Sequence, residues 1–215
     1  MKNKTLNKFC FLLAIFFIVA CSEERPITSE ITFFPTFEVS GDQYMTIEQG
    51  STFTDPGAIA LAGDGTLPVT TSGSVNTSTL GVYKLEYKAT NVDGFEGSAF
   101  RYVAVVDDLA AITSNDLSGS YTRDSNTGHV MTLTKLGGAF YDADDVLPTN
   151  KINVFIVQVS STELIAPRQS SRFGDIVIDP SVEAGSSGTI LATGDITLQT
   201  YIGCCGVFTR RFLKN

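Results

Sequence analysis

The side chains that could carry out catalysis are few and scattered. His129 is the single histidine of the 215 residues, so it would be the sole imidazole able to activate a serine, and sites built from several histidines are excluded. Ser120 and Ser125 lie near it in sequence, but the chain has no Gly-x-Ser-x-Gly turn to present a nucleophile. We expect His129 to be an ordinary strand residue and the protein to be no enzyme, with no catalytic residue and no cofactor.

Acidic residues are densest in the sequence Asp142-Ala143-Asp144-Asp145. Alternate carboxylates after a strand could bind calcium or act as an acid/base pair. The spacing of an EF-hand loop, with its glycine and distant glutamate, is absent. We interpret the cluster first as a solvated turn, then as a site for calcium or a polar ligand, and last as a catalytic pair. No metal site is predicted.

Two adjacent cysteines, Cys204 and Cys205, stand near the end of the chain. Neighbouring Cα atoms are about 3.8 Å apart, which is below the usual minimum of ~4.4 Å for a disulfide. The preferred interpretation is a pair of reduced thiols on opposite faces of a strand. A strained disulfide between the two neighbours is the alternative.

Residues 2–21 have the features of an export signal. Three lysines among the first eight residues precede the apolar run Phe9–Ala20, and a small residue stands just before Cys21. An apolar run of about a dozen residues is shorter than the roughly 20 that a membrane-spanning helix needs. A membrane helix or a plain signal peptide is therefore the weaker alternative. The pattern resembles bacterial lipoprotein signals, which implies that residues 1–20 are removed and that the Cys21 thiol receives a diacylglyceryl group.

The residues that follow Cys21 suggest where the protein is held. Ser22-Glu23-Glu24 resembles the short acidic tag that directs some Gram-negative lipoproteins to the cell surface, although it could be merely a solvated start. Residues 21–30 are polar and without periodicity, which predicts a flexible tether. We expect a lipid anchor in the outer membrane, with the folded part facing the cell exterior.

The charge of the chain excludes two classes of partner. Without the three signal lysines, 12 of the 15 Lys and Arg remain against 23 Asp and Glu, a net charge near −11. Nucleic acid and anionic membrane surfaces are poor partners for such a protein.

Residues 31–108 are predicted to form an immunoglobulin-like β-sandwich. Short apolar segments alternate with Gly, Asp, Asn and Pro clusters, and five to seven strands at this spacing form a sandwich. The expected strands are Tyr44–Glu48, Gly57–Ala60, Val69–Ser72, Gly81–Thr90 and Ser98–Val106. The motifs Gly50–Ala58, Thr71–Asn76, Leu80–Tyr87, Asn91–Gly94 and Arg101–Val105 resemble the bacterial Ig-like domain of surface and secreted proteins. That resemblance implies a spacer or stalk.

Residues 116–215 are predicted to form a second all-β domain after a short, partly apolar linker. Its many short strands favour an antiparallel barrel or a flattened sandwich. The expected strands are Gly119–Arg123, His129–Lys135, Ala139–Tyr141, Ile152–Val159, Leu164–Arg168, Asp175–Asp179, Thr189–Ala192, Ile196–Ile202 and Val207–Phe212. Leu117–Arg123, Met131–Leu136, Phe140–Tyr141 and Gly206–Arg210 resemble the domain that follows Ig-like domains in lipoproteins of polysaccharide-utilisation systems.

Two functional hypotheses follow from these features. The first is a non-catalytic glycan-binding accessory lipoprotein, and the second is a structural or assembly component that binds other surface proteins. Tryptophan, a common platform for sugar rings, is absent. We predict a ligand face in the second domain that combines aromatic with polar groups, formed by Tyr121, Arg123, Tyr141 and Asp142. If both tyrosines belong to the core, the second hypothesis, a structural or assembly component, is favoured.

The lipid site provides the first testable prediction. Replacing Cys21 by alanine should abolish incorporation of radiolabelled palmitate and release the protein from membranes, because the acylated thiol is lost. The unfolding curve should not change, since no residue before about position 31 is expected to pack. A mutant that still incorporates palmitate would contradict the lipoprotein assignment.

Overall fold

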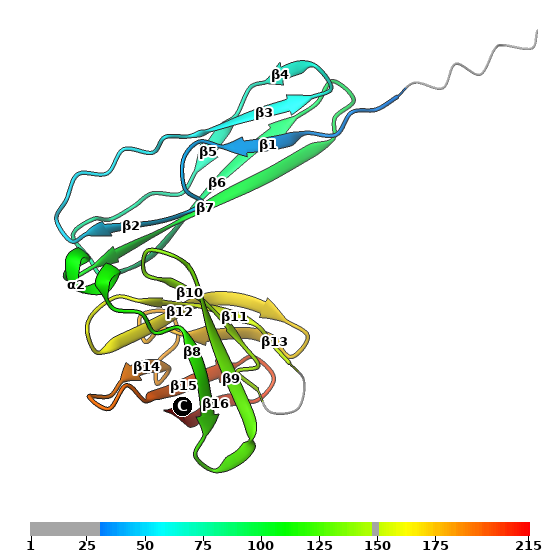
Figure 1. Ribbon diagram of the computed structural model, residues 1–215. Helices are drawn as coiled ribbons and strands as arrows, with labels where there is room; N and C mark the ends of the chain where they lie inside the picture. Colours follow the sequence, from blue (N-terminus) through cyan, green and yellow to red (C-terminus); the bar gives the residue numbers. More distant parts are fainter. Residues whose placement is uncertain (1–30, 148–150) are drawn as a thin grey trace, which may run out of the picture. The chain divides into compact units, whose positions relative to one another are not determined.

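The computed structural model describes residues 31–147 and 151–215, and almost all of its regular structure is β-strand (Figure 1). This confirms the predicted all-β fold class. The expected signal, Cys21 and the tether lie outside the described residues. Within these residues, no helix is long and apolar enough to cross a membrane.

The first region, residues 36–106, has the two sheets of an Ig-like domain. One sheet has the order β1-β3-β4 and the other the order β2-β7-β6-β5, with antiparallel neighbours except for the parallel pair β2 and β7. Two strands, β2 and β6, begin and end where the sequence predicts, whereas β1 and β4 were not expected. The strands are β1 Thr36–Val39, β2 Tyr44–Glu48, β3 Ala58–Ala62, β4 Gly65–Leu67, β5 Thr70–Ser72, β6 Gly81–Thr90 and β7 Glu96–Val106.

A buried arginine joins the two sheets of this region. Arg101 of β7 is fully buried, and its guanidinium donates to the carbonyl oxygens of Ser40 and Gly57, which flank strands of the other sheet. Its Nη1 lies 3.6 Å from Asp55 Oδ1, and the Tyr87 hydroxyl donates to the same oxygen at 2.8 Å. Burial, together with this hydrogen bond, raises the pKa of Tyr87 to about 12. Asp55 is therefore a structural residue that compensates a buried charge.

The second region is an eight-stranded antiparallel barrel. The neighbours run β11-β10-β9-β8-β16-β15-β13-β12, and a further pairing of β11 with β12 closes the ring; β14 pairs with β12 and β15. The barrel is one of the two architectures that the sequence predicts. The strands are β8 Gly119–Arg123, β9 Asn126–Gly137, β10 Phe140–Asp144, β11 Val154–Gln158, β12 Glu163–Ser171, β13 Gly174–Ile178, β14 Ser187–Ile190, β15 Ile196–Ile202 and β16 Gly206–Lys214.

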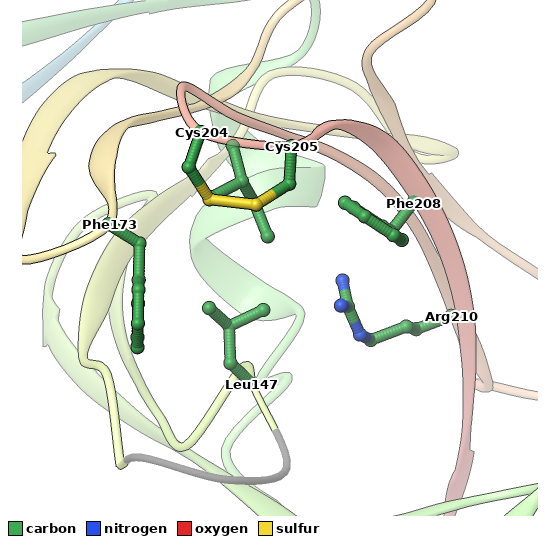
Figure 2. A pocket seen from close by; sticks show the side chains of 7 residues that line it. Leu147, Phe173, Cys204, Cys205, Phe208 and Arg210 are labelled. Atoms are coloured by element: carbon green, nitrogen blue, oxygen red, sulfur yellow. A yellow bond between two sulfur atoms is a disulfide. The ribbon is translucent and has the colours of Figure 1, made fainter.

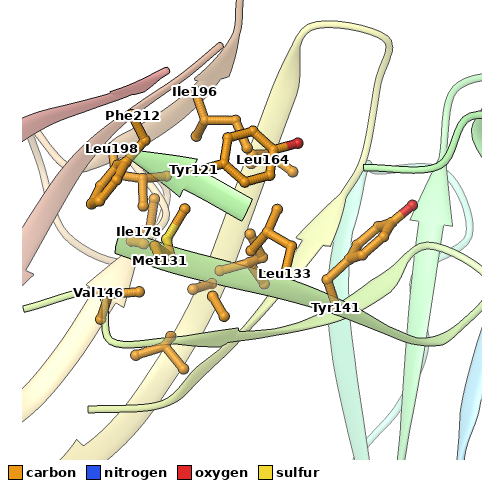
Figure 3. Packing of buried hydrophobic residues seen from close by; sticks show 14 of the residues in the cluster. Tyr121, Met131, Leu133, Tyr141, Val146, Leu164, Ile178, Ile196, Leu198 and Phe212 are labelled. Atoms are coloured by element: carbon orange, nitrogen blue, oxygen red, sulfur yellow. The ribbon is translucent and has the colours of Figure 1, made fainter. Parts of the chain in front are cut away.

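Side chains of the barrel strands fill its interior. Every second residue of β15, from Ile196 to Ile202, is buried, as expected where one face of a strand points inward. The largest members of this cluster include two tyrosines, a methionine and a phenylalanine (Figure 3). Eight strands enclose a space that side chains alone can fill. A ligand must therefore bind outside this packed core.

A second hydrophobic cluster includes residues of both regions. Alternate residues of β7 point to opposite faces: Val103 and Val105 lie on the face that carries Arg101, while Ala104 and Val106 join Phe140 and other barrel residues in the shared cluster. Rings from the two regions meet here, with Tyr102 and Phe155 centroids 4.6 Å apart. The end of β7 is therefore buried on both faces.

Backbone contacts reinforce this junction. Ala139 N donates to Thr46 Oγ1 at 2.9 Å, and Asp107 N donates to Val159 O at 3.0 Å. Glycine is needed at position 138, because a Cβ there would lie 2.1 Å from Thr46 Oγ1. The backbone at Gly138 and the Thr46 side chain are therefore packed without a gap.

Helix α2, Leu109–Ser114, occupies the predicted linker. Asp108 caps it by accepting a hydrogen bond from Ala111 N at 2.9 Å, and Ile112 packs into the shared cluster. Residues 33–215 form one compact unit. The division into separate domains at residues 31–108 and 116–215 stays a prediction.

The second testable prediction concerns the hydrophobic cluster shared by the two regions. Phe140 is fully buried, with its ring centroid 5.2 Å from that of Tyr44, so Phe140→Ala should remove ring contacts on both sides of the junction. We expect it to lower the free energy of unfolding by about 3–5 kcal/mol, measured by urea denaturation. Val92→Ala, at a side chain that is 98% exposed, is the control and should change little. Equal unfolding curves for the two variants would contradict the packing described here.

Candidate functional site

The structure corrects the predicted ligand face at Tyr121 and Tyr141. Both rings are fully buried inside the barrel (Figure 3). The Tyr121 hydroxyl donates to Leu117 O at 2.8 Å, while that of Tyr141 donates to Asn115 O at 3.1 Å and accepts from Leu117 N at 3.3 Å. The inward faces of closed strands carry these rings, so they cannot stack on a sugar. Instead they fasten the segment before β8 to the barrel.

The other two predicted ligand residues are partly exposed but do not complete that face. Asp142 alternates with Tyr141 along β10 and so points away from the interior. Its Oδ2 accepts from Asn153 Nδ2 at 3.2 Å, and burial, aided by nearby Asp144, raises the pKa of Asp142. Arg123, at the end of β8, lies instead near a second arginine at one end of the barrel.

The remaining acidic residues of the cluster have separate roles. Asp144 Oδ1 accepts from Thr132 N at 2.6 Å, and the Asp145 carbonyl contacts His129 Nε2. His129 lies in β9, as predicted, and is 3% exposed, with its ring edge against Phe212. In residues 31–147 and 151–215, no three His, Cys, Asp or Glu side chains are grouped to hold a metal ion.

The cysteine pair is a disulfide, which corrects the preferred interpretation of reduced thiols. The Cys204 and Cys205 sulfurs are bonded, with the two Cα atoms 3.8 Å apart. The reason lies in their backbone. These residues form the turn between β15 and β16, so their side chains need not point to opposite faces as they would along a strand.

A pocket of about 210 Å³ lies at the end of the barrel where this disulfide turn is found. It is formed by the turn between β12 and β13, the connection after β10 and the beginning of β16. Figure 2 shows side chains from these segments surrounding one space. The lining residues are Leu147, Phe173, Ile202, Cys204, Cys205, Phe208 and Arg210.

Two glycines hold the pocket's turns together. Gly203 N donates to Asp175 O at 2.8 Å and Cys204 N donates to Phe173 O at 3.1 Å. A Cβ on Gly203 would lie 3.0 Å from Asp175 N, and one on Gly174 would lie 3.2 Å from the Gly203 Cα. The two backbones therefore meet so closely that a side chain at either glycine would make a tight contact. This backbone contact holds Phe173 and the Cys204–Cys205 disulfide next to each other in the pocket lining.

Arg210 is the charged residue of the pocket. It lies on the same face of β16 as Phe208 and Phe212, and its guanidinium points between Leu147 and Phe208 (Figure 2). The Arg210 Cζ lies 5.4 Å from the Phe208 ring centroid, a cation–π contact. Its Nε and Nη1 are buried without a hydrogen-bond partner in the described part of the chain. Burial, and to a lesser extent the charge of Arg123, lowers the pKa of Arg210.

The pocket lining combines apolar side chains, a polarisable disulfide and one guanidinium whose Nε and Nη1 have no hydrogen-bond partner among the described residues. A largely apolar lining with a few polar groups is typical of ligand pockets. The neighbouring sequence contains a signal for it: glycines on either side of the two cysteines indicate a turn, and Phe208 and Arg210 share one strand face.

The fold is that of an all-β protein with an Ig-like region and a barrel that has a pocket at one end. Residues 37–105 match the family described as bacterial surface protein, Ig-like domain, which supports a bacterial surface protein. The crystal structure of a lipoprotein from Bacteroides thetaiotaomicron is similar at 20% identity and a TM-score of 0.37, covering 85% of this chain and all of that one; this score is too low to carry an argument. No curated protein matches the chain.

The third testable prediction concerns the hydrogen bonds of the buried tyrosine hydroxyls. Tyr141→Phe should lower the free energy of unfolding by about 1–3 kcal/mol, because Asn115 O and Leu117 N lose a buried partner. Tyr201→Phe is the matched control, since its hydroxyl has no hydrogen-bond partner among the described residues. Chemical denaturation measures both variants. Unchanged stability in Tyr141→Phe would show that the hydroxyl does not fasten the segment before β8.

Proposed function

We propose that this protein is a non-catalytic, glycan-binding lipoprotein of the cell surface, acting beside a polysaccharide-utilisation system. In this proposal Cys21 is acylated and anchors the chain in the outer membrane, with the barrel facing the exterior. The Ig-like region serves as a spacer, and the pocket beside Phe208 and Arg210 binds the glycan. The observation that carries the proposal is the guanidinium of Arg210 in a largely apolar pocket, where its Nε and Nη1 have no hydrogen-bond partner among residues 31–147 and 151–215.

The chemistry of the lining supports a sugar as ligand. Phe208, 39% exposed, offers a flat apolar face for the C–H face of a sugar ring, and the guanidinium donates hydrogen bonds to ring oxygens or substituents. The volume of about 210 Å³ is below the roughly 300–1,000 Å³ of pockets for drug-sized ligands. The pocket therefore suits one sugar unit, such as a chain end or a branch.

The non-catalytic part of the proposal is supported by the placement of His129. The ring is almost fully buried and its Nε2 contacts the backbone of Asp145, so it is not positioned to activate a nucleophile. The pocket lining contains no carboxylate that could act as an acid or a base.

The alternative function, a structural component that binds another surface protein, is favoured by a different surface. Phe33, Phe34 and Phe95 of the Ig-like region are 55%, 60% and 45% exposed, and the last two have ring centroids 4.9 Å apart. Exposed aromatic clusters often mark protein contacts. The burial of Tyr121 and Tyr141 also removes one argument for sugar binding and so adds weight to this alternative.

The fourth prediction tests the pocket with two neighbouring residues. Full-length protein purified in detergent should bind members of an array of neutral and acidic glycans, and Phe208→Ala should weaken that binding about tenfold, a loss of ~1.4 kcal/mol. Val207→Ala is the matched control. It is similarly exposed, 42% against 39%, and it points to the other face of β16.

Two results would contradict the proposal. Wild-type protein that retains no glycan on the array would exclude a glycan-binding function. Equal weakening by both variants would show that the pocket is not the site. If the wild type instead captures a surface protein and Phe34→Ser abolishes that capture, the structural alternative is supported.

A further inference from the structure

The pocket contains more positive charge than the protein around it. The chain as a whole carries a net charge of −8, yet Arg210 in the pocket has Arg123 close enough to disfavour its charged form. Neither arginine forms an ion pair with a described residue. Buried donors on both side chains lack hydrogen-bond partners there: Nε and Nη1 of Arg210, and Nε of Arg123.

The lack of a protein anion beside these arginines points to a ligand that supplies one. Two like charges at the end of a barrel are unfavourable unless an anion compensates them. The other arginines show the contrast: Arg211, next in sequence, has its Nη2 2.9 Å from Asp195 Oδ2, and Arg168 has its Nη1 3.0 Å from Asp175 Oδ2. Arg168 and Arg211 are thus each paired with an aspartate, whereas Arg210 has no ion-pair partner among the described residues.

The geometry of the guanidinium limits which class of anion fits best. A guanidinium presents two parallel N–H donors in one plane, which match the two oxygens of a carboxylate. The contact with the Phe208 ring limits how this plane can turn. The same ring offers an apolar face beside the guanidinium, so a flat ring with a carboxylate substituent can use both at once.

We propose that the pocket is selective for sugars of the uronic-acid type, whose carboxylate binds the guanidinium of Arg210 while the sugar ring packs on Phe208. This inference rests on the proposed function and refines it by naming the substrate class. Arg123 adds a second positive charge that favours the same anion. Neutral sugars would offer Arg210 only uncharged oxygens and bind more weakly, because hydrogen bonds between two charged groups are stronger.

Calorimetric titration of the full-length protein in detergent tests the selectivity. The probes are the methyl glycosides of glucuronic and galacturonic acid, the neutral methyl glucoside and glucose 6-sulfate. We expect the uronates to bind about tenfold or more tightly than the neutral sugar. Their affinity should fall as ionic strength rises, because salt screens the charge contact.

Three variants assign the preference to one residue. Arg210→Gln should lower the ratio of uronate affinity to neutral-sugar affinity about tenfold. Arg210→Lys keeps a charge but loses the planar fork, and should retain part of the preference. Arg211→Gln is the matched control and should behave as wild type, because this side chain alternates away from the pocket. Unfolding curves show whether each variant is folded.

The outcomes separate this inference from the proposed function. Equal binding of uronates and the neutral sugar would overturn the inference while the glycan-binding function stands. Equal binding of the sulfate and the uronates would overturn selectivity for a carboxylate. Absence of binding by every sugar probe and by the glycan array would overturn both.

Discussion

The pairing of β11 with β12 closes the barrel, and the rest of the second region depends on this closure. Only two residue pairs make it, Val157 with Ile165 and Gln158 with Leu164. The buried Gln158 reinforces it by donating to Ser160 O at 3.1 Å and accepting from Asn115 Nδ2 at 3.3 Å. Because eight closed strands leave an interior that their own side chains fill, a pocket can open only at the barrel ends or on its outer surface. The turns place the disulfide, Phe208 and Arg210 at one such end.

The end of β7 joins the two regions through a single strand. One of its faces completes the Ig-like sandwich, where Arg101 is compensated by Asp55, and the other face packs against barrel residues such as Phe140. Helix α2 and the tyrosine hydroxyls then hold the connecting segment in place. If the Ig-like region serves as a spacer, this junction would fix the direction in which the barrel points from it. The contact consists of packed side chains and backbone hydrogen bonds rather than a flexible linker.

Much of the fold could be predicted from the sequence, but most of the candidate site could not. Strand periodicity and turn residues located β2, β6, β8 and β15 at their observed bounds. Alternation places Tyr121 and Arg123 on one face, yet it cannot tell an outer from an inner face before the closure of the barrel is known. For the cysteines, a strand was assumed where the chain turns. The continuous apolar run Tyr102–Val106 is typical of a strand buried on both faces, but two-sided burial of β7 was not among the predictions.

Because β8 pairs with β16, closure of the barrel depends on the order in which its strands are synthesised. These neighbours are the first and last strands of the barrel, so the ring stays open until the residues after Gly206 have emerged. Contacts so distant in sequence form slowly, and the apolar face of β7 at Ala104 and Val106 waits for its barrel partners meanwhile. Until β16 pairs with β8, apolar residues that line the barrel are exposed to water, and exposed apolar surface of this kind favours aggregation.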